Sequence, residues 1–347
     1  MRPNRFSVLQ IAFAVGIALV CITVTAAPAA DFYKGKTIRI IVGSAPGGGF
    51  DTYARLVARH LPKHIPGTPR TLVTSMTGAG NLIAANYMYN KAKPDGLTIG
   101  HWVGTLVLQQ VLGNKRVQFD ARKFEWITVP KPSYTACIVA RDSGITNMEE
   151  WLAAKKPLKL GGMGPGSSIS DIPRLLVNIT GVPLQLIEGY GGAARIRLAI
   201  EKREVMGGCW SPDVIFSYWP KQIPAGELNF VIQVGVGRHP SFANVPNLLE
   251  HAKNDAQRQL ASVVGRNAHE ILRAFSLPPG TPKDRVELLR KAFADTFKDP
   301  ELLAEAKKSR LIINPIPGPR VAEAVNEFFQ LDAELMARLK SILVPKQ

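Results

Sequence analysis

The chain has 347 residues, of which 46% are hydrophobic and 20% are charged. This composition is typical of folded domains and excludes disorder for most of the chain. Lysine and arginine number 43 against 27 acidic residues, a formal net charge of +16. Like charges run no longer than pairs, so we interpret the excess as a solvated surface and expect no nucleic-acid partner. Three cysteines are too few for a disulfide-rich scaffold or a multi-cysteine zinc protein.

The N-terminus has the pattern of an export signal. Basic residues precede an uncharged apolar run, 11–24, which is shorter than the roughly 20 residues that a membrane-spanning helix needs. Ala27 and Ala29 then fit the small-residue rule for a cleavage site. We predict a signal peptide over 1–29, cleaved after Ala29, and a periplasmic mature protein; the alternative is a membrane anchor.

Two cysteines, Cys137 and Cys209, would remain in the exported chain. A disulfide between them would close a long loop and contribute roughly 4 kcal/mol in the chain-entropy model. Alternatively, they are two small buried side chains on separate strands. The sequence leaves both possibilities open.

The first predicted unit is a strand, a glycine-rich loop and a helix. A β-branched run predicts a strand at 37–42, and the glycines of 43–49 predict a loop. A helix follows and ends at Pro62. Asp51 is its predicted N-cap, whose carboxylate would accept hydrogen bonds from the free N–H groups of the first turn.

This unit recurs along the first third of the chain. The predicted elements are a strand at 71–76, a loop at 77–80, a helix at 81–91, a strand at 97–102 and a short helix ending at Leu112. Alternating strands and helices at this spacing indicate parallel β-α-β units.

A second series of strands and helices begins after residue 130. Its predicted strands are 136–140, 158–161, 184–188, 205–210 and 230–236, and its predicted helices are 172–180 and 193–202. The remainder is predicted to be helical, over 245–264, 282–297, 301–309 and 320–343. This tail has no glycine loop after a strand, so we interpret it as scaffold.

Together these elements predict two similar α/β lobes. The first comprises 30–129 plus 237–347, and the second comprises 130–236. If the helical tail returns to the first lobe, the chain crosses between lobes twice and forms a hinge. The cleft between the lobes is then the expected ligand site.

Glycine-rich loops follow several predicted strands, at the sheet edge where ligands of parallel sheets bind. Each loop can present free N–H groups at a helix N-terminus, which makes an anion site without a charged side chain. The alternative is that the glycines only permit tight turns. The loops lack the complete P-loop and dinucleotide motifs, and we expect no cofactor.

Catalytic and metal-binding patterns are weak. Ser167 and Ser168 are candidate nucleophiles, but serine at a helix start is more typical of a cap. His60 and His64 have the i, i+4 spacing of a metal pair, yet Pro62 lies between them, so we predict no metal site. Aromatic residues at the strand ends, namely Trp102, Tyr190 and Trp210, are interpreted either as core or as walls of the cleft.

Several motifs occur together in a recognisable order. They are Ala-Pro-Gly-Gly-Gly-Phe-Asp at 45–51, Gly-Ala-Gly-Asn at 78–81, Pro-Asp-Gly at 94–96, the Gly-Ser loop at 161–168 and Gly-Tyr-Gly-Gly at 189–192. In this order they resemble the extracytoplasmic solute receptors of tripartite tricarboxylate transporters, the Bug family. The resemblance covers nearly all of 33–340.

The resemblance implies a two-lobed Venus-flytrap receptor, each lobe a mainly parallel sheet flanked by helices. Such a receptor feeds a small carboxylated compound to membrane permease subunits and is not an enzyme; we also expect a monomer. The expected ligand-binding residues are Ser44, Ala45, Pro46, Gly47, Gly48, Gly49, Phe50, Asp51, Thr77, Gly78, Ala79, Gly80, Asn81, Thr105, Ser167, Ser168, Tyr190, Gly191 and Trp210.

These loops contain little positive charge, so we expect the ligand's carboxylate to be held by main-chain dipoles and not by an ion pair. Arg195 is the nearest candidate counter-ion. The family's histidine after the second-lobe serines is absent, because 168–172 reads Ser-Ile-Ser-Asp-Ile. Two rival functions are an exported α/β hydrolase, whose Gly-x-Ser-x-Gly elbow is missing, and a ligand-presenting partner of a sensor.

Overall fold

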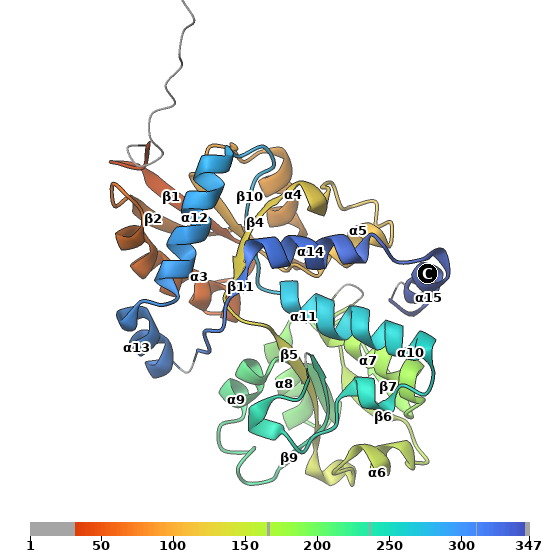
Figure 1. The fold of residues 1–347 in the computed structure, drawn as a ribbon. Coiled ribbons are helices and arrows are strands. Elements are labelled where there is room, and N and C mark those ends of the chain that lie inside the picture. The colour runs from red at the N-terminus through yellow and green to blue at the C-terminus, as the bar shows by residue number, and fades with distance from the viewer. Residues whose placement is uncertain (1–31, 165–166, 236, 310, 344–347) are drawn as a thin grey trace, which may run out of the picture.

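The computed structural model describes residues 32–164, 167–235, 237–309 and 311–343. The predicted signal peptide, 1–29, and its cleavage site lie outside these ranges. Within them, every helix is too short or too polar to cross a bilayer. Two sheets with flanking helices make up the molecule, one above the other in Figure 1.

The first sheet has six strands in the order β11-β4-β10-β3-β1-β2. They are β1 (Thr37–Val42), β2 (Arg70–Ser75), β3 (Thr98–His101), β4 (Glu125–Val129), β10 (Phe275–Leu277) and β11 (Ile316–Pro317). β1 is parallel to β2 and β3, whereas β10 is antiparallel to β3 and β4, and β11 is antiparallel to β4. The sheet is therefore mainly parallel by strand direction, as predicted, but β4, β10 and β11 were not predicted as strands.

Helices cover this sheet on both faces. They are α3 (Gly49–His60), α4 (Leu82–Asn90), α5 (Leu106–Val111), α12 (Lys283–Thr296), α13 (Pro300–Lys308) and α14 (Gly318–Phe328). α3 buries Ala54 and Val57 in a core shared with Ile38 and Ile40 of β1. The helical spacing of its apolar residues therefore predicted this packing face correctly.

The second sheet has five strands in the order β7-β6-β8-β5-β9. They are β5 (Tyr134–Ala140), β6 (Leu158–Gly161), β7 (Leu184–Ile187), β8 (Gly207–Trp210) and β9 (Leu228–Gly235). Only β5 among these strands opposes the common direction, because it is antiparallel to both β8 and β9 while β6 is parallel to β7 and β8. The flanking helices are α6 (Met148–Leu152), α7 (Ser168–Thr180), α8 (Ala193–Glu201) and α9 (Pro212–Tyr218).

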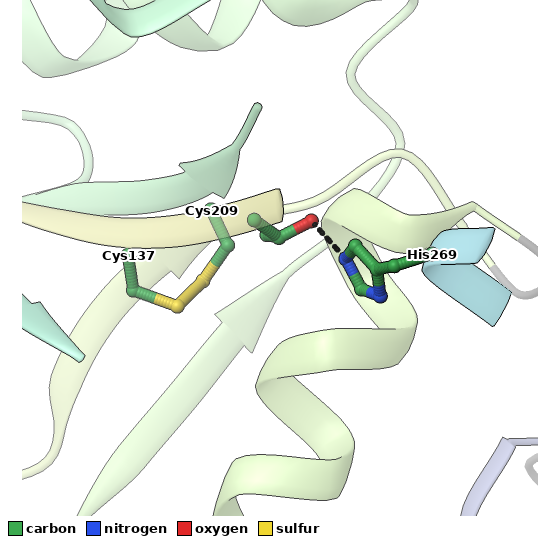
Figure 2. The surroundings of a disulfide bond; sticks show 4 residues. Cys137, Cys209 and His269 are labelled. Carbon is green, nitrogen blue, oxygen red and sulfur yellow. Dashed lines mark hydrogen bonds between the residues drawn. A yellow bond between two sulfur atoms is a disulfide. The ribbon is translucent and has the colours of Figure 1, made fainter. Parts of the chain in front are cut away.

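A disulfide joins two strands of the second sheet. Cys137 of β5 and Cys209 of β8 are directly opposite in the antiparallel register, with their Cα atoms 4.0 Å apart. Figure 2 shows the bridge beneath the strands, near His269. Of the two possibilities left open by the sequence, the structure forms the bridge, and the strand register supplies the proximity that sequence cannot.

The segment that returns from the second sheet is not the single helix predicted over 245–264. It contains a 3-10 turn, η6 (Leu248–His251), then α10 (Asp255–Ala261), a π-helical segment, η7 (Ser262–Asn267), and α11 (Ala268–Ile271). Two asparagines explain the break. Asn247 and Asn254 are N-caps whose side chains accept from Leu249 and Gln257, so each starts a new helical segment.

The helix predicted over 320–343 is likewise two helices. α14 packs against β4 of the first sheet, whereas α15 (Ala333–Leu343) packs against α7 and α10 beside the second sheet. Asp332 accepts a hydrogen bond from the Leu335 N–H and so starts α15 as a new helix. α10 and α15 thus contact α7 of the second half, whereas α14 contacts the first sheet, and the grouping of all of 237–347 with the first lobe stays a prediction.

Candidate functional site

A cavity of about 580 Å³ lies between the two sheets. Eight of the expected binding residues line it, and they come from both halves: Ser44, Phe50, Ala79, Gly80, Asn81, Ser167, Ser168 and Trp210. Thr105 instead lines a much smaller adjoining cavity of about 30 Å³. A volume of the larger size accommodates a small organic ligand.

Other expected residues lie outside the cavity walls. Ten of the expected residues are absent from the described lining of both cavities: Ala45, Pro46, Gly47, Gly48, Gly49, Asp51, Thr77, Gly78, Tyr190 and Gly191. Tyr190 is partly buried and packs against the core cluster that includes Trp210 and Trp219, in agreement with the core interpretation. Trp102 is also core, because it is 1% exposed and its indole N–H donates to Ser276 at 3.0 Å.

The first loop is held from within its helix. α3 begins at Gly49 and its N-cap is Gly48, so the prediction that Asp51 is the N-cap is wrong. Asp51 is buried in the first turn and accepts from the Gly47 N–H at 2.9 Å and from Arg55 at 2.8 Å. Burial raises the pKa of Asp51, but the hydrogen bonds from Arg55 and Gly47 outweigh it and lower the pKa below its usual value.

The second loop has an unusual backbone. Gly78, Ala79, Gly80 and Asn81 all have positive φ, of 131°, 45°, 63° and 77°. For Ala79 and Asn81 this is a strained conformation, of a kind that clusters at ligand sites. Asn81 accepts from the Ser44 hydroxyl at 3.4 Å, and a Cβ at Gly43 would lie 2.4 Å from its side chain. The two loops of the first half therefore interlock at the cavity.

The loop of the second half is organised by a serine that we did not predict. Ser170 is fully buried in α7, and its hydroxyl accepts from the N–H groups of Met163 and Gly164, both at 2.9 Å. Its hydroxyl also fills the space beside Gly162, where a Cβ would lie 2.6 Å away. Ser167 is the N-cap of α7 but makes no capping hydrogen bond through its side chain.

A charged cluster of two buried cations and one partly exposed acid lies at the segments joining the two halves. Lys131 follows β4, Arg273 precedes β10, and Asp213 lies in the first turn of α9. Lys131 donates to both carboxylate oxygens of Asp213, at 2.9 and 2.8 Å, and an Arg273 nitrogen is 3.8 Å from that carboxylate. Burial lowers the pKa of Lys131, and the Asp213 carboxylate opposes that change.

Arg273 is a buried charged residue of the cavity lining that sequence reasoning missed. It lines the cavity although only 4% of its surface is exposed. Arg195, the expected counter-ion, is exposed and lies outside the cavity lining. No signal in the sequence marks Arg273, because it belongs to the tail that we interpreted as scaffold and reaches the cavity only through the return of the chain.

The rest of the cavity lining that was not predicted is largely apolar. These residues are Leu82, Val103, Leu106, Gln109, Asn114, Arg116, Thr135, Met163, Gly164, Ile169, Ala193, Ser211, Val214 and Leu272. Leu82, Ile169 and Ala193 follow a predicted glycine loop by one or two residues. The first helical turn after each loop was therefore the signal that could have found them.

A serine, a histidine and an acid share the small cavity. Ser168, Asp171 and His269 all line it, which invites comparison with a hydrolytic triad. His269 instead contacts the Thr135 hydroxyl, 3.0 Å from its Nε2. Burial lowers the pKa of His269 to about 4, so the ring is neutral at ordinary pH. The ring therefore serves the packing between the two halves.

A group of possible metal ligands lies far from the cavity. Donor atoms of His60, Asp299 and Glu301 lie within 4.8 Å of one another. The ammonium group of Lys63 lies among them, 2.6 Å from Asp299 and 2.9 Å from Glu301. Lys63 thus supplies the positive charge that a metal ion would bring to these carboxylates. The expectation that His60 and His64 bind no metal stays a prediction.

The sequence matches a known family over most of its length. The profile of the tripartite tricarboxylate transporter family receptor matches residues 53–312. The chain belongs to this family. It is therefore a solute-binding receptor by family, in agreement with the resemblance seen in its loop motifs.

Curated relatives and solved structures agree with this assignment. A UPF0065 protein of Cupriavidus necator is 25% identical over 281 residues, covering 78% of this chain and 77% of its own. The periplasmic binding protein BugD has 20% identity and a TM-score of 0.68, over 91% of this chain and all of that one. At this level of identity, the structural match shows a shared fold.

Two further structures with this fold contain ligands. MatC from Rhodopseudomonas palustris, with bound malate, matches with a TM-score of 0.62 and 18% identity, over 89% of this chain and 99% of its own. An R. palustris protein with adipate matches with a TM-score of 0.66 and 19% identity, over 89% of this chain and 98% of its own.

Proposed function

We propose that this chain captures a small organic acid in the cavity between its lobes and delivers it to the permease subunits of a membrane transporter. The observation that carries this proposal is the charge of the cavity: it contains a buried arginine, Arg273, and none of its described lining residues is acidic. Fold relatives with malate and adipate support an organic acid as the ligand class.

The eight expected binding residues that line the cavity form part of this proposal. Loops from both halves meet at the cavity, so a bound ligand would bridge Ser44 and Asn81 on one side with Ser167 and Ser168 on the other. Closure of the lobes about the crossing segments would then shield the ligand from water. The receptor acts as a monomer without catalysis.

The decisive experiment is a binding screen with mono-, di- and tricarboxylates. A ligand at about one hundred times its dissociation constant should add about 2.7 kcal/mol of stability, which a thermal-shift assay detects. Calorimetry of the hits should give one site per chain, with the ligand recovered unchanged. Turnover of the ligand would favour the exported hydrolase, and the absence of any carboxylate ligand would overturn the proposal.

Localisation and partner are tested separately. A mature protein that begins near Ala30 should appear in an osmotic-shock fraction, whereas a membrane-bound chain with Met1 intact would overturn the export prediction. Pull-down with the ligand present should recover permease subunits. Recovery of a sensor protein in their place would favour the ligand-presenting alternative.

A further inference from the structure

The strongest unassigned feature is the guanidinium of Arg273. It lies in the segment between α11 and β10, where the chain returns to the first sheet. Its Nη1 donates to the Ser133 hydroxyl at 3.0 Å, and its Nη2 is 3.8 Å from Asp213, beyond hydrogen-bond distance. Its buried Nε has no hydrogen-bond partner among the described residues. A buried arginine thus keeps donor capacity at the wall of a cavity.

The cluster around Arg273 has more positive than negative charge. Asp213 is the acid in contact with it, and that carboxylate already accepts two hydrogen bonds from Lys131. Both cationic side chains are about 95% buried, at 5% and 6% exposure. A buried charge without a full partner is costly, so the cluster favours the arrival of one anionic group.

Neighbouring groups direct that anion to one place. The ring of Phe50 lies 5.6 Å from the Arg273 guanidinium, and the N-terminus of the twelve-residue helix α3 is adjacent. A Cβ added to Gly49 would lie 3.2 Å from Nη2, which shows how closely the helix start approaches the guanidinium. A helix N-terminus and an arginine at such separation both favour a carboxylate.

The remaining walls suit an apolar body. Leu82, Leu106, Ile169, Trp210 and Val214 line the cavity from both halves. Arg116 is the other cation of the lining, and its side chain is exposed, where an ion pair contributes little. Among its described lining residues, the cavity therefore has one desolvated cation together with extended apolar surface.

We propose that Arg273 is the specificity-determining residue of this receptor, binding one carboxylate directly, and that the ligand is a monocarboxylate with an apolar aromatic or aliphatic body. This inference rests on the proposed function and narrows its ligand class. It also replaces the expectation that main-chain dipoles alone hold the ligand. A tricarboxylate would bring further negative charges, for which the described lining residues provide no second buried cation.

The test is calorimetry with a panel of benzoate, hexanoate, adipate, malate and citrate, together with benzamide and hexanamide. In the wild-type protein the tightest ligand should be benzoate or hexanoate, and its amide should bind at least about tenfold more weakly. Tightest binding of a di- or tricarboxylate would overturn the inference but leave the proposed function intact. If no acid in the panel binds, both are overturned.

Variants then separate Arg273 from general effects of charge. Arg273→Gln should weaken binding of the preferred acid by about 100-fold, because a desolvated charge-assisted contact is lost. Lys115→Gln, at an exposed side chain outside the described cavity lining, is the matched control and should change affinity less than about threefold. Equal effects of the two substitutions would contradict the inference.

A second pair of variants tests the same contact if Arg273→Gln fails to fold. Gly49→Ala places a methyl group against the guanidinium, whereas Gly48→Ala meets only the Ala45 carbonyl, at 3.5 Å. Gly49→Ala should weaken binding of the acid at least about threefold by displacing the guanidinium, and Gly48→Ala should leave it unchanged. Unchanged binding in Gly49→Ala would overturn the direct contact.

Discussion

The Nε2 atom of His269 lies 3.0 Å from the hydroxyl oxygen of Thr135, a contact marked by the dashed line in Figure 2. Thr135 is in β5, just after the chain enters the second half, and His269 is in α11, just before the chain leaves it. The backbone carbonyl of His269 also accepts from the Ser133 N–H at 2.9 Å. The two crossing segments are therefore bonded to each other beside the ligand cavity.

The burial of His269 and His101 predicts a loss of stability in mild acid. Burial lowers the pKa of His269 to about 4 and that of His101 to about 3. The unfolded chain, with an ordinary pKa near 6.5, binds more protons than the folded one below that pH, so the free energy of unfolding falls as pH falls. At pH 5 each histidine should remove about 2 kcal/mol relative to pH 7.

Chemical denaturation between pH 7 and pH 5 measures this dependence. His269→Gln retains a group that can hydrogen-bond to Thr135 but does not titrate. The free energy of unfolding of this variant should therefore fall by about 2 kcal/mol less between pH 7 and pH 5 than that of the wild-type protein. An equally steep dependence in the variant would show that other groups cause the acid sensitivity.

The disulfide should contribute substantially to stability. It joins residues separated by 72 positions, for which the chain-entropy model gives about 4 kcal/mol. Replacing Cys137 and Cys209 together by alanine should lower the free energy of unfolding in urea by about that amount. A reducing agent should destabilise the wild-type protein similarly and leave the double variant unchanged.

Binding should respond as well, because Trp210 follows Cys209 and lines the cavity. If the disulfide affected stability alone, its reduction would lower the free energy of unfolding without weakening ligand binding. We expect weaker binding in the double variant, measured by calorimetry at a temperature where both proteins are folded.

The local elements of this fold were predictable because they depend on short patterns. The β-branched run at 37–42 matches β1, and the apolar spacing of Ala54 and Val57 gave the packed face of α3. Glycine loops after strands identified the edge of the sheet at which the cavity lies. These features require only neighbours in sequence and the geometry of strands and helices.

The missed features depend on contacts between distant segments. β10 and β11 are short strands whose partners lie far away in the sequence: β10 pairs with β3 and β4, and β11 pairs with β4. Arg273 reaches the cavity only after the chain has passed through the second half and returned. Asp51 was misassigned because it hydrogen-bonds back to the Gly47 N–H from inside the helix, an arrangement that capping rules alone do not distinguish.

Asp51 should nevertheless control the shape of the first loop. Asp51→Ala removes the acceptor for the Gly47 N–H and the partner of Arg55, and it should cost about 1 kcal/mol of stability. It should also weaken ligand binding, because Ser44 and Phe50 flank this loop and line the cavity. Asp51→Asn retains an acceptor and should recover part of both losses. Unchanged ligand affinity in Asp51→Ala would show that Asp51 contributes to stability and not to ligand binding.

Gly104 gives the last prediction, because it lies where the first half touches the return segment. Its N–H donates to the Leu272 carbonyl at 3.0 Å, and an added Cβ would lie 2.0 Å from the Ile271 carbonyl oxygen. Gly104→Ala must therefore push the return segment away, at a cost of about 1–3 kcal/mol. The same displacement moves Leu272 and Arg273, so binding of the acid should weaken together with stability.

Gly191→Ala is the matched control, because its Cβ would meet only Arg195, at 3.6 Å. Differential scanning calorimetry and titration calorimetry measure the two effects, and wild-type values for Gly104→Ala would contradict a fixed contact at this position.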